Sequence, residues 1–156
     1  MASKRDQIKL DDAEIAAYLA EEKTVVVATT GPNGRPHLMP LWFVVRGTEI
    51  WGWTFAKSQK AKNLTRDQHA TLLFEDGVSY EKLRGVMYEC DVEILRDSDA
   101  IRDIGIELFT KYGDGNYPAE PVIAMIEAQV PKRIGLRFTP TRTVSWDHGK
   151  LASGVY

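Results

Sequence analysis

One feature restricts the fold of this chain more than any other: an aromatic stretch followed directly by the lysine-rich start of a helix. Residues 51–64 read Trp-Gly-Trp-Thr-Phe-Ala-Lys-Ser-Gln-Lys-Ala-Lys-Asn-Leu. Trp51, Trp53 and Phe55 share one face of a strand, because side chains in a strand alternate with a period of two. Ser58 is a typical N-cap residue, and the backbone N–H groups of the helix behind it would point at an anion. The stretch therefore predicts either a phosphate cradle beside a flat ring or a solvated lysine turn after a core strand.

Length and charge limit the class of protein. The chain has 156 residues, which fits a single domain over residues 1–156 with a sizeable core. Lys and Arg total 20 against 22 Asp and Glu, giving a formal charge of −2. This balance excludes a generally basic nucleic-acid binder but permits a local basic site. Residues 57–66 form such a site, with Lys57, Lys60, Lys62 and Arg66 and no acid.

Cysteine, histidine and hydropathy patterns point to a reducing compartment and to no metal. Cys90 is the only cysteine, so no disulfide forms within the chain. The chain starts without an apolar signal core and has no run long enough for a membrane helix, so we expect a cytoplasmic protein that binds no membrane. The three histidines are widely separated and show no metal-ligand spacing.

Hydrophobic periodicity and turn signals predict a mainly β protein with flanking helices. We expect helices over 10–20, after Ser58, over 97–112 and over 121–129, and strands over 24–30, 35–45, 48–55, 70–75, 85–95 and 134–138, with 143–146 as one further candidate. Gly31-Pro-Asn-Gly34 joins the first two strands as a hairpin, and Asp76-Gly77 separates the fourth from the fifth. Short turns between strands favour a small six-stranded antiparallel barrel over a doubly wound sheet.

The order of these elements and four local stretches resemble the flavin and deazaflavin oxidoreductases of the pyridoxamine 5′-phosphate oxidase-like class, over about residues 11–148. The fold that this resemblance implies is the FMN-binding type of split β-barrel. The third stretch is the most specific, because its lysine stands three residues before an asparagine. The four stretches are the hairpin 25–37, Met39-Pro-Leu-Trp-Phe43, Lys57-Ser-Gln-Lys-Ala-Lys-Asn-Leu64 with Arg66-Asp67, and Thr139-Pro-Thr-Arg-Thr-Val-Ser-Trp-Asp147.

The resemblance implies roles for residues of the cofactor site. Lys60 matches the principal phosphate-binding lysine of the family, Ser58 stands where a second phosphate contact is usual, and Asn63 resembles the residue that holds the turn. Pro40 and Trp42 match the segment that runs along the ring.

Two further assignments concern more distant positions. Tyr80 resembles an aromatic residue that lines the cofactor pocket. Arg133 resembles a basic residue contributed from across a dimer, although the adjacent Lys132 could fill the same place.

One departure from the family bears on the choice of cofactor. Gln59 follows Ser58 in this chain. Enzymes of the family that bind flavin mononucleotide (FMN) commonly have arginine at this position, in the motif Ser-Arg-Lys. A guanidinium binds phosphate through two parallel bonds, so its loss weakens the case for FMN. Family members with a motif similar to this one tend to use the deazaflavin coenzyme F420. Its acidic tail would form ion pairs with Lys57, Lys62 and Arg66.

Three classes of function remain open. The resemblance favours an F420-dependent oxidoreductase that passes hydride to a conjugated small-molecule acceptor such as a tetrapyrrole or a quinone, with water or Tyr80 supplying the proton. The alternatives are an FMN-dependent oxidoreductase like pyridoxamine 5′-phosphate oxidase and an F420-binding carrier without turnover. No catalytic acid or base stands out in the sequence, which is compatible with chemistry carried by a cofactor. The split barrel and the apolar surface of a small, Trp-rich chain further predict a homodimer.

Overall fold

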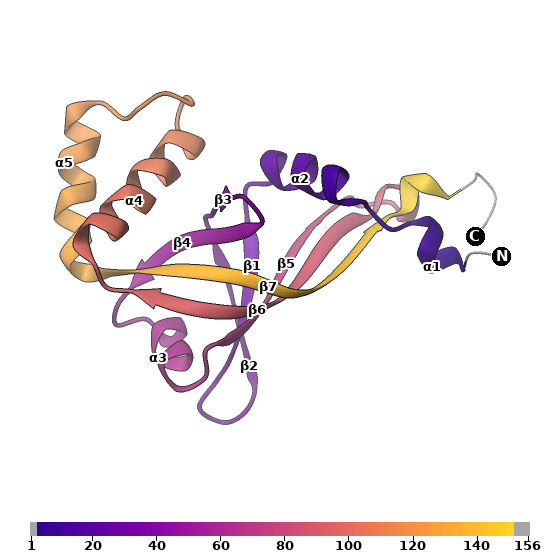
Figure 1. Cartoon of the computed structure of the whole chain (residues 1–156), viewed down its shortest axis with the longest axis horizontal. Helices are drawn as coiled ribbons and strands as arrows, with labels where there is room; N and C mark the ends of the chain where they lie inside the picture. Colours follow the sequence, from indigo (N-terminus) through magenta and orange to yellow (C-terminus); the bar gives the residue numbers. More distant parts are fainter. Residues whose placement is uncertain (1–2, 152–156) are drawn as a thin grey trace.

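The computed structural model of the protein describes residues 3–151, whose strands form one antiparallel sheet that curls into a half-barrel (Figure 1). Its seven strands have the order β2-β1-β5-β6-β7-β4-β3. The strands are β1 (Val25–Thr30), β2 (Pro36–Leu41), β3 (Val44–Arg46), β4 (Glu49–Phe55), β5 (His69–Asp76), β6 (Arg84–Leu95) and β7 (Arg133–Asp147). The predicted mainly β barrel with flanking helices is confirmed, with seven strands in place of six.

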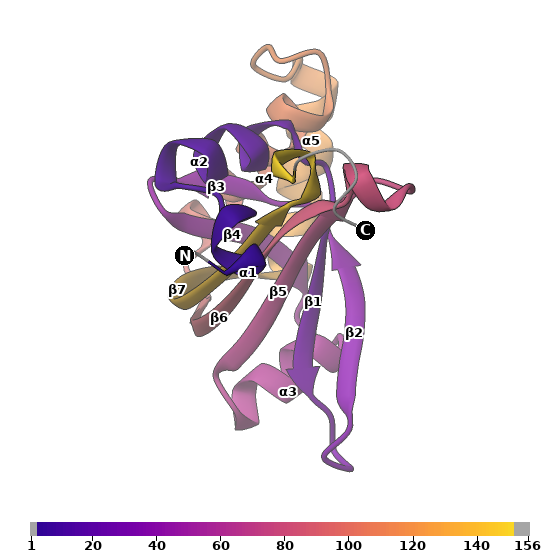
Figure 2. The same ribbon diagram turned by 90° about the vertical axis from the view of Figure 1, so that its right-hand side faces the viewer.

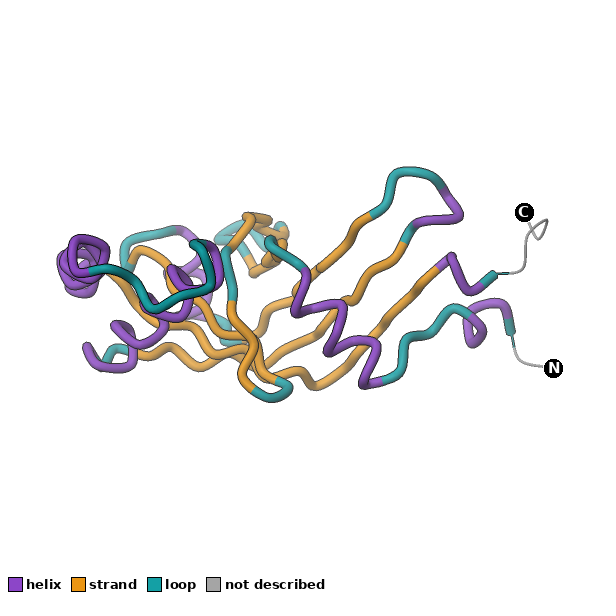
Figure 3. The backbone as a smooth tube through the Cα atoms, turned by 90° about the horizontal axis from the view of Figure 1, so that it is seen from above, coloured by secondary structure: helices purple, strands orange, loops and turns teal. Residues whose placement is uncertain are grey.

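Five α-helices and three short 3₁₀ turns accompany the sheet in the described part of the chain. The helices are α1 (Lys4–Gln7), α2 (Asp12–Glu21), α3 (Gln59–Arg66), α4 (Ser98–Tyr112) and α5 (Glu120–Gln129), and the turns are η1 (Tyr80–Lys82), η2 (Val130–Lys132) and η3 (His148–Lys150). Seen from above, α4 and α5 gather at one end of the sheet, while α1 lies at the other (Figure 3). Within residues 3–151, no helix is both long and apolar enough to cross a membrane.

Two hydrophobic clusters lie on opposite faces of β4. Ile50 points into the barrel, where it joins residues of α2 and α3, and Trp53 points to the other face, where it joins residues of α4 and α5. A glycine allows α4 to lie this close, because a Cβ on Gly105 would stand 2.7 Å from Trp53 Cζ3. Figure 2 shows the sheet from its side, with α3 near the lower end of β1 and β5. The alternation of β4 thus separates a barrel interior from a helix-covered face.

The end of β2 lies close to β4, without pairing with it. A Cβ on Gly52 would lie 3.0 Å from both Leu41 Cδ2 and the Trp42 carbonyl oxygen. Only a residue without a side chain permits this approach of two backbones. This approach places Trp42 beside the helix-covered face of β4.

The predicted strand over residues 35–45 is divided into β2 and β3, because the chain turns a corner at Trp42 and Phe43. The Phe43 N–H donates to the hydroxyl of Tyr112 at 3.0 Å, and this hydroxyl donates to the Lys23 carbonyl at 2.7 Å. Trp42 stacks on the Tyr112 ring at 4.3 Å. A residue of α4 therefore fixes the corner, and nothing local in the sequence marks it.

Residues 134–138 and 143–146, predicted as separate strands, belong to one continuous strand, β7. It pairs with all twelve residues of β6, and the register shifts between Glu89 and Cys90, opposite Pro140. Proline lacks a donor for the ladder and is tolerated at such an irregularity. The Pro140 region bends the strand without ending it.

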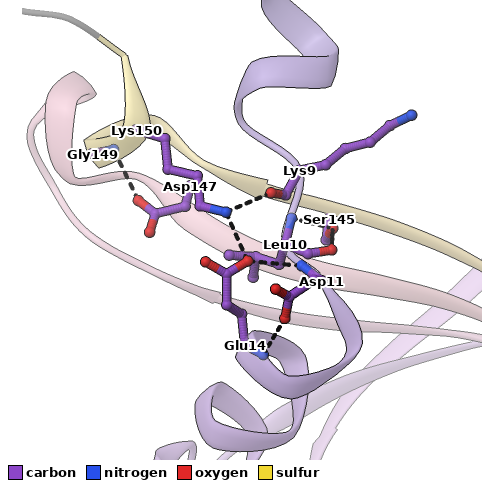
Figure 4. Close-up of polar contacts among 8 residues, drawn as sticks. All are labelled: Lys9, Leu10, Asp11, Glu14, Ser145, Asp147, Gly149 and Lys150. Atoms are coloured by element: carbon purple, nitrogen blue, oxygen red, sulfur yellow. Dashed lines mark hydrogen bonds and ion pairs between the residues drawn. The ribbon is translucent and has the colours of Figure 1, made fainter.

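The N-terminal segment is bound to the far end of β7, as Figure 4 shows. Leu10 N–H donates to Ser145 Oγ at 3.0 Å, and Lys150 Nζ lies 2.7 Å from both the Lys9 carbonyl oxygen and Glu14 Oε2. Asp11 caps α2 by accepting from the Glu14 N–H at 2.8 Å. The sequence did not predict helix α1. This helix begins after its N-cap residue Ser3, which forms a capping box with Asp6. These contacts hold α2 across the barrel end.

Candidate cofactor site

Helix α3 begins at Ser58, directly after β4. The Ser58 hydroxyl accepts a hydrogen bond from Ala61 N–H at 3.1 Å and lies 3.3 Å from Thr54 Oγ1. The Ser58 N–H is bound to the Phe55 carbonyl at 3.0 Å, so the turn between strand and helix is tight. The predicted N-cap is confirmed, and the first N–H groups of a helix have no partner within it. The start of α3 is therefore suited to an anion.

Lys60 lies buried in the first turn of α3. The residue is 5% exposed, and its ammonium group makes no hydrogen bond or ion pair with any residue that the structure describes. Burial lowers the pKa of its ammonium group. A buried, unpaired cation is costly, and an anion beside it would offset that cost. Lys57, by contrast, is exposed at the rim of the turn.

Asn63 holds α3 against the barrel. It is fully buried, and its side-chain nitrogen donates to Thr29 Oγ1 at 3.0 Å. Its side-chain oxygen accepts from Gln59 Nε2 at 2.7 Å and from an Arg66 guanidinium nitrogen at 3.1 Å. The Gln59 side chain is therefore engaged along the helix.

His37 is a further candidate site residue, which the sequence did not single out. It pairs with Thr29 across β1 and β2, so both side chains point to the face that α3 covers. Its Nδ1 is buried and has no hydrogen-bond partner among the described residues. The turn of the hairpin 31–34 sets this register, so pairing from the turn would have placed His37 beside Thr29.

Pro40 and Trp42 line a pocket of about 440 Å³ on the other face of β4. Its remaining walls come from β2, β4, α4, α5 and the start of β7, namely Leu41, Trp53, Phe55, Phe109, Met125, Gln129 and Arg133. We call this hollow the aromatic pocket. Trp42, 49% exposed, presents one ring face to Tyr112 and meets Phe109 edge-on at 6.4 Å.

The start of α3 and the aromatic pocket meet at the end of β4. Thr54 faces Ser58 and the barrel interior, and Phe55 faces the aromatic pocket. Ala56 N–H donates to the Lys132 carbonyl at 2.9 Å, which joins this turn to the start of β7. Ser58, Lys60 and Asn63 are therefore brought together on one side, and Pro40, Trp42 and Arg133 on the other.

Tyr80 lies apart from both groups within one chain. It belongs to η1, beyond the end of β5, where it meets the His148 ring at 4.5 Å. Helix α3 adjoins the opposite end of β5, and eight residues of strand separate the two ends, which is roughly 26 Å. The expectation that Tyr80 lines the cofactor pocket therefore remains a prediction that requires a second chain.

The residues present fit a cofactor that combines an anionic group with a flat ring. Lys60 supplies an unpaired buried charge, the start of α3 supplies N–H groups, and His37 Nδ1 is a buried nitrogen that needs a partner. Aromatic side chains lie close by at the end of β4. No catalytic nucleophile is needed for such a site, because the cofactor carries the reactive atom.

Comparisons with known proteins show the family and the fold of the chain. A family model described as pyridoxamine 5′-phosphate oxidase matches residues 11–147. A crystal structure of a conserved hypothetical protein from Mycobacterium tuberculosis is 39% identical, with a TM-score of 0.87, covering 96% of this chain and 92% of the other. No curated protein matches the chain in sequence.

Two more distant structures share the fold. A putative 5-nitroimidazole antibiotic resistance protein from Bacteroides thetaiotaomicron is 14% identical, with a TM-score of 0.73, covering 88% of this chain and 84% of the other. A structure described as an F420 reductase is 22% identical, with a TM-score of 0.64, covering 81% of this chain and 93% of the other.

Proposed function

The chain belongs to the pyridoxamine 5′-phosphate oxidase family, and on this basis we propose that it is an F420-dependent reductase that transfers hydride to a conjugated small-molecule acceptor. The fold is of the type that binds flavin-like cofactors in an oxidoreductase superfamily. The observation that carries the proposal is the buried and unpaired Lys60 at the start of α3, next to Gln59 in place of a phosphate-binding arginine.

Lys60 and Ser58 would hold the cofactor phosphate, with the first N–H groups of α3. His37 Nδ1 would donate a hydrogen bond to the same cofactor or accept one from it, depending on the tautomer. Asn63 acts by positioning α3, since its side chain is used within the protein. Pro40 and Trp42 would border the ring where β2 meets β4.

The preference for F420 over FMN rests on the basic residues around α3. Without a guanidinium at residue 59, the phosphate loses a two-point contact that lysine does not replace. Lys57, Lys62 and Arg66 flank the cradle, and all three lie exposed where they could meet an acidic tail. Such contacts are screened by salt, so this part of the affinity should fall as ionic strength rises.

When bound in the α3 cradle, reduced F420 would supply the hydride. The chain itself would supply orientation through the α3 cradle and the aromatic side chains at the end of β4, and the proton would come from water or from Tyr80 of the partner subunit.

We also propose a homodimer, in which the second copy covers the outer face of the sheet. The register aligns Pro40, Val26, Leu73, Met87 and Val144 in one row across five neighbouring strands. All five are apolar, and each is at least partly exposed in the single chain. A self-complementary apolar row of this kind suits a two-fold contact, and Tyr80 would line the site only from the partner subunit.

Titration of the purified protein with F420 and with FMN, followed by ring fluorescence, tests the proposal. We expect F420 to bind more tightly and Lys60→Ala to weaken it about ten- to a hundredfold, as for a lost charge-assisted hydrogen bond. Lys62→Ala, an exposed lysine of the same helix, is the matched control and should cost less. A yellow protein that keeps stoichiometric FMN and ignores F420 would favour the FMN alternative. F420 binding without turnover on a broad set of conjugated acceptors would favour the carrier.

Sedimentation tests the dimer. Leu73→Glu should give a monomer with weaker F420 binding, because it places a charge in the middle of the apolar row. Val45→Glu puts the same charge at an exposed position on β3 and should leave the dimer intact. A wild-type monomer at micromolar concentration that still binds F420 tightly would contradict the dimer.

A further inference from the structure

The aromatic pocket has the size and the walls of a binding site for a flat molecule. An enclosed hollow of about 150 Å³ is enough to hold benzene, and the pocket has about 440 Å³. It therefore has room for two or three fused rings. Trp53 and Phe55 project into it from alternate positions of β4, and Trp42 and Phe109 face them. Pockets of this size with apolar walls and few polar groups are the usual form of small-molecule sites.

Arg133 is the one cationic residue among those that line the aromatic pocket. Its guanidinium carbon lies 3.9 Å from the Phe55 ring centre and 4.6 Å from that of Trp53. Gln129 Oε1 accepts two weak bonds from it, at 3.2 and 3.3 Å. Burial lowers the pKa of this guanidinium, so part of its hydration has been removed.

Two other arginines stack on a tryptophan, and both differ from Arg133 in one respect. Arg46 and Arg137 lie over Trp51, at 4.2 and 5.5 Å from its ring centre. Arg46 is paired with Glu107, and Arg137 with Glu49 and Glu93. Arg133 has no carboxylate partner among the described residues. Its remaining N–H groups are therefore available to an anion from outside the chain.

We propose that the Arg133 side of the aromatic pocket binds the hydride acceptor, beside the coenzyme ring that Pro40 and Trp42 would border, and selects a planar conjugated acid whose carboxylate pairs with Arg133. This role replaces the contact across a dimer that the family resemblance implies for Arg133. The role of this ligand as acceptor rests on the proposed function, whereas its chemical class rests on the pocket alone. A neutral quinone of the same size would fill the aromatic pocket but leave Arg133 without an anionic partner. Arg133 is thus a specificity residue that distinguishes acids from neutral isosteres.

The arrangement of β4 separates this pocket from the cofactor phosphate. Lys60 and Ser58 lie with Thr54 on the barrel side, and Arg133 lies with Phe55 on the helix side. Neighbouring residues of a strand point to opposite faces. The two cations therefore serve two anions at different places.

A binding comparison with full-length, cofactor-free protein tests the inference. The probes are 2-naphthoate and its neutral isostere 2-naphthamide, measured by calorimetry. We expect the wild type to bind the acid about tenfold or more tightly than the amide, as expected for a charge-assisted pair. Arg133→Gln should abolish this preference, and Arg133→Lys should retain part of it because the charge remains. Equal binding of both probes by the wild type, or an unchanged preference in Arg133→Gln, would overturn the proposal.

Arg137→Gln is the matched control, since it removes an arginine from the same strand that also stacks on a tryptophan. It should leave the preference for the acid unchanged, and loss of the preference in this variant would refute the assignment to Arg133. Unfolding temperatures of all three variants show whether each is folded.

Lys60→Ala separates this inference from the proposed function. It should weaken F420 binding and leave naphthoate binding unchanged. If F420 fails to bind the wild type while naphthoate shows the Arg133-dependent preference, the proposed function is wrong and the acid-binding pocket stands. If F420 binds as expected and the acid is not preferred, only the pocket proposal is wrong.

Discussion

The side-chain amide of Asn63 donates a 3.0 Å hydrogen bond to the Thr29 hydroxyl, which ties the middle of α3 to β1 inside the barrel. Both residues are buried. Replacing Asn63 with leucine should lower the free energy of unfolding by about 1–3 kcal/mol, because buried polar partners lose their bonds. Urea denaturation measures the change. Gln59→Ala, which removes one bond at a half-buried position, should cost less, and an equal or larger cost there would contradict the central role of Asn63.

Lys60 should be a liability in the cofactor-free protein. Burial lowers the pKa of its amine below the ordinary value of 10.5, so the unfolded chain binds this proton more tightly than the folded one. Stability therefore rises with pH from the lowered pKa up to about 10.5. Lys60→Met should raise the unfolding temperature at pH 7, and its advantage should shrink toward pH 10.5. Lys62→Met, on the exposed side of α3, should show neither effect. A difference in unfolding temperature between Lys60→Met and the wild type that does not change with pH would refute this account.

Lys111 should titrate near neutral pH. Its Nζ donates to the Phe43 carbonyl at 3.0 Å and lies 3.5 Å from the centre of the Phe43 ring. Burial, and then the charge of Lys23, lower its pKa from 10.5 to about 8. Its protonation therefore favours the unfolded chain, and stability should rise between about pH 8 and 10.5.

Carbon NMR of the lysine side chains checks the Lys111 midpoint directly. Lys23→Gln should raise this midpoint only partly toward 10.5, because burial is the larger cause. A wild-type midpoint near 10.5 would show that the amine is hydrated.

At Gly105, helix propensity and packing are expected to change the stability of the protein in opposite directions when alanine replaces glycine. Alanine in a helix interior is usually favoured over glycine by about 1 kcal/mol. A Cβ at residue 105, however, would stand 2.7 Å from Trp53 Cζ3 and 2.9 Å from Ile126 Cγ2. Overpacking of this kind costs about 1–3 kcal/mol, so we expect Gly105→Ala to destabilise the protein. Asp103→Ala, at an exposed position of the same helix, is the control. Stabilisation by Gly105→Ala would show that α4 can move away from β4.

Local patterns were enough to predict most elements near the cradle. The aromatic alternation of β4, the cap at Ser58 and the hairpin turn 31–34 each have a local physical cause, and all three are confirmed. The same holds for α4, whose N-cap Asp97 and apolar spacing are visible in the chain.

Features that depend on distant contacts were not predicted. The corner at Phe43 depends on Tyr112, which is 69 residues away. The continuity of β7 through Pro140 depends on the length of β6. The buried Nδ1 of His37 and the pocket around Arg133 arise only when the sheet curls and the helices pack. Whether Tyr80 joins the site depends on a second chain, which no pattern within one sequence can place.

The alternation of side chains along β4 has a consequence for how such proteins diverge. Thr54 contacts the residue that begins the cradle, and Trp53 and Phe55 form walls of the aromatic pocket. On the proposed assignments, substitutions at Trp53 and Phe55 would change the choice of acceptor, and substitutions at Thr54 would change the hold on the coenzyme phosphate. One short strand thus lets selection act on the two properties separately, so that new substrates can be acquired while the coenzyme is kept.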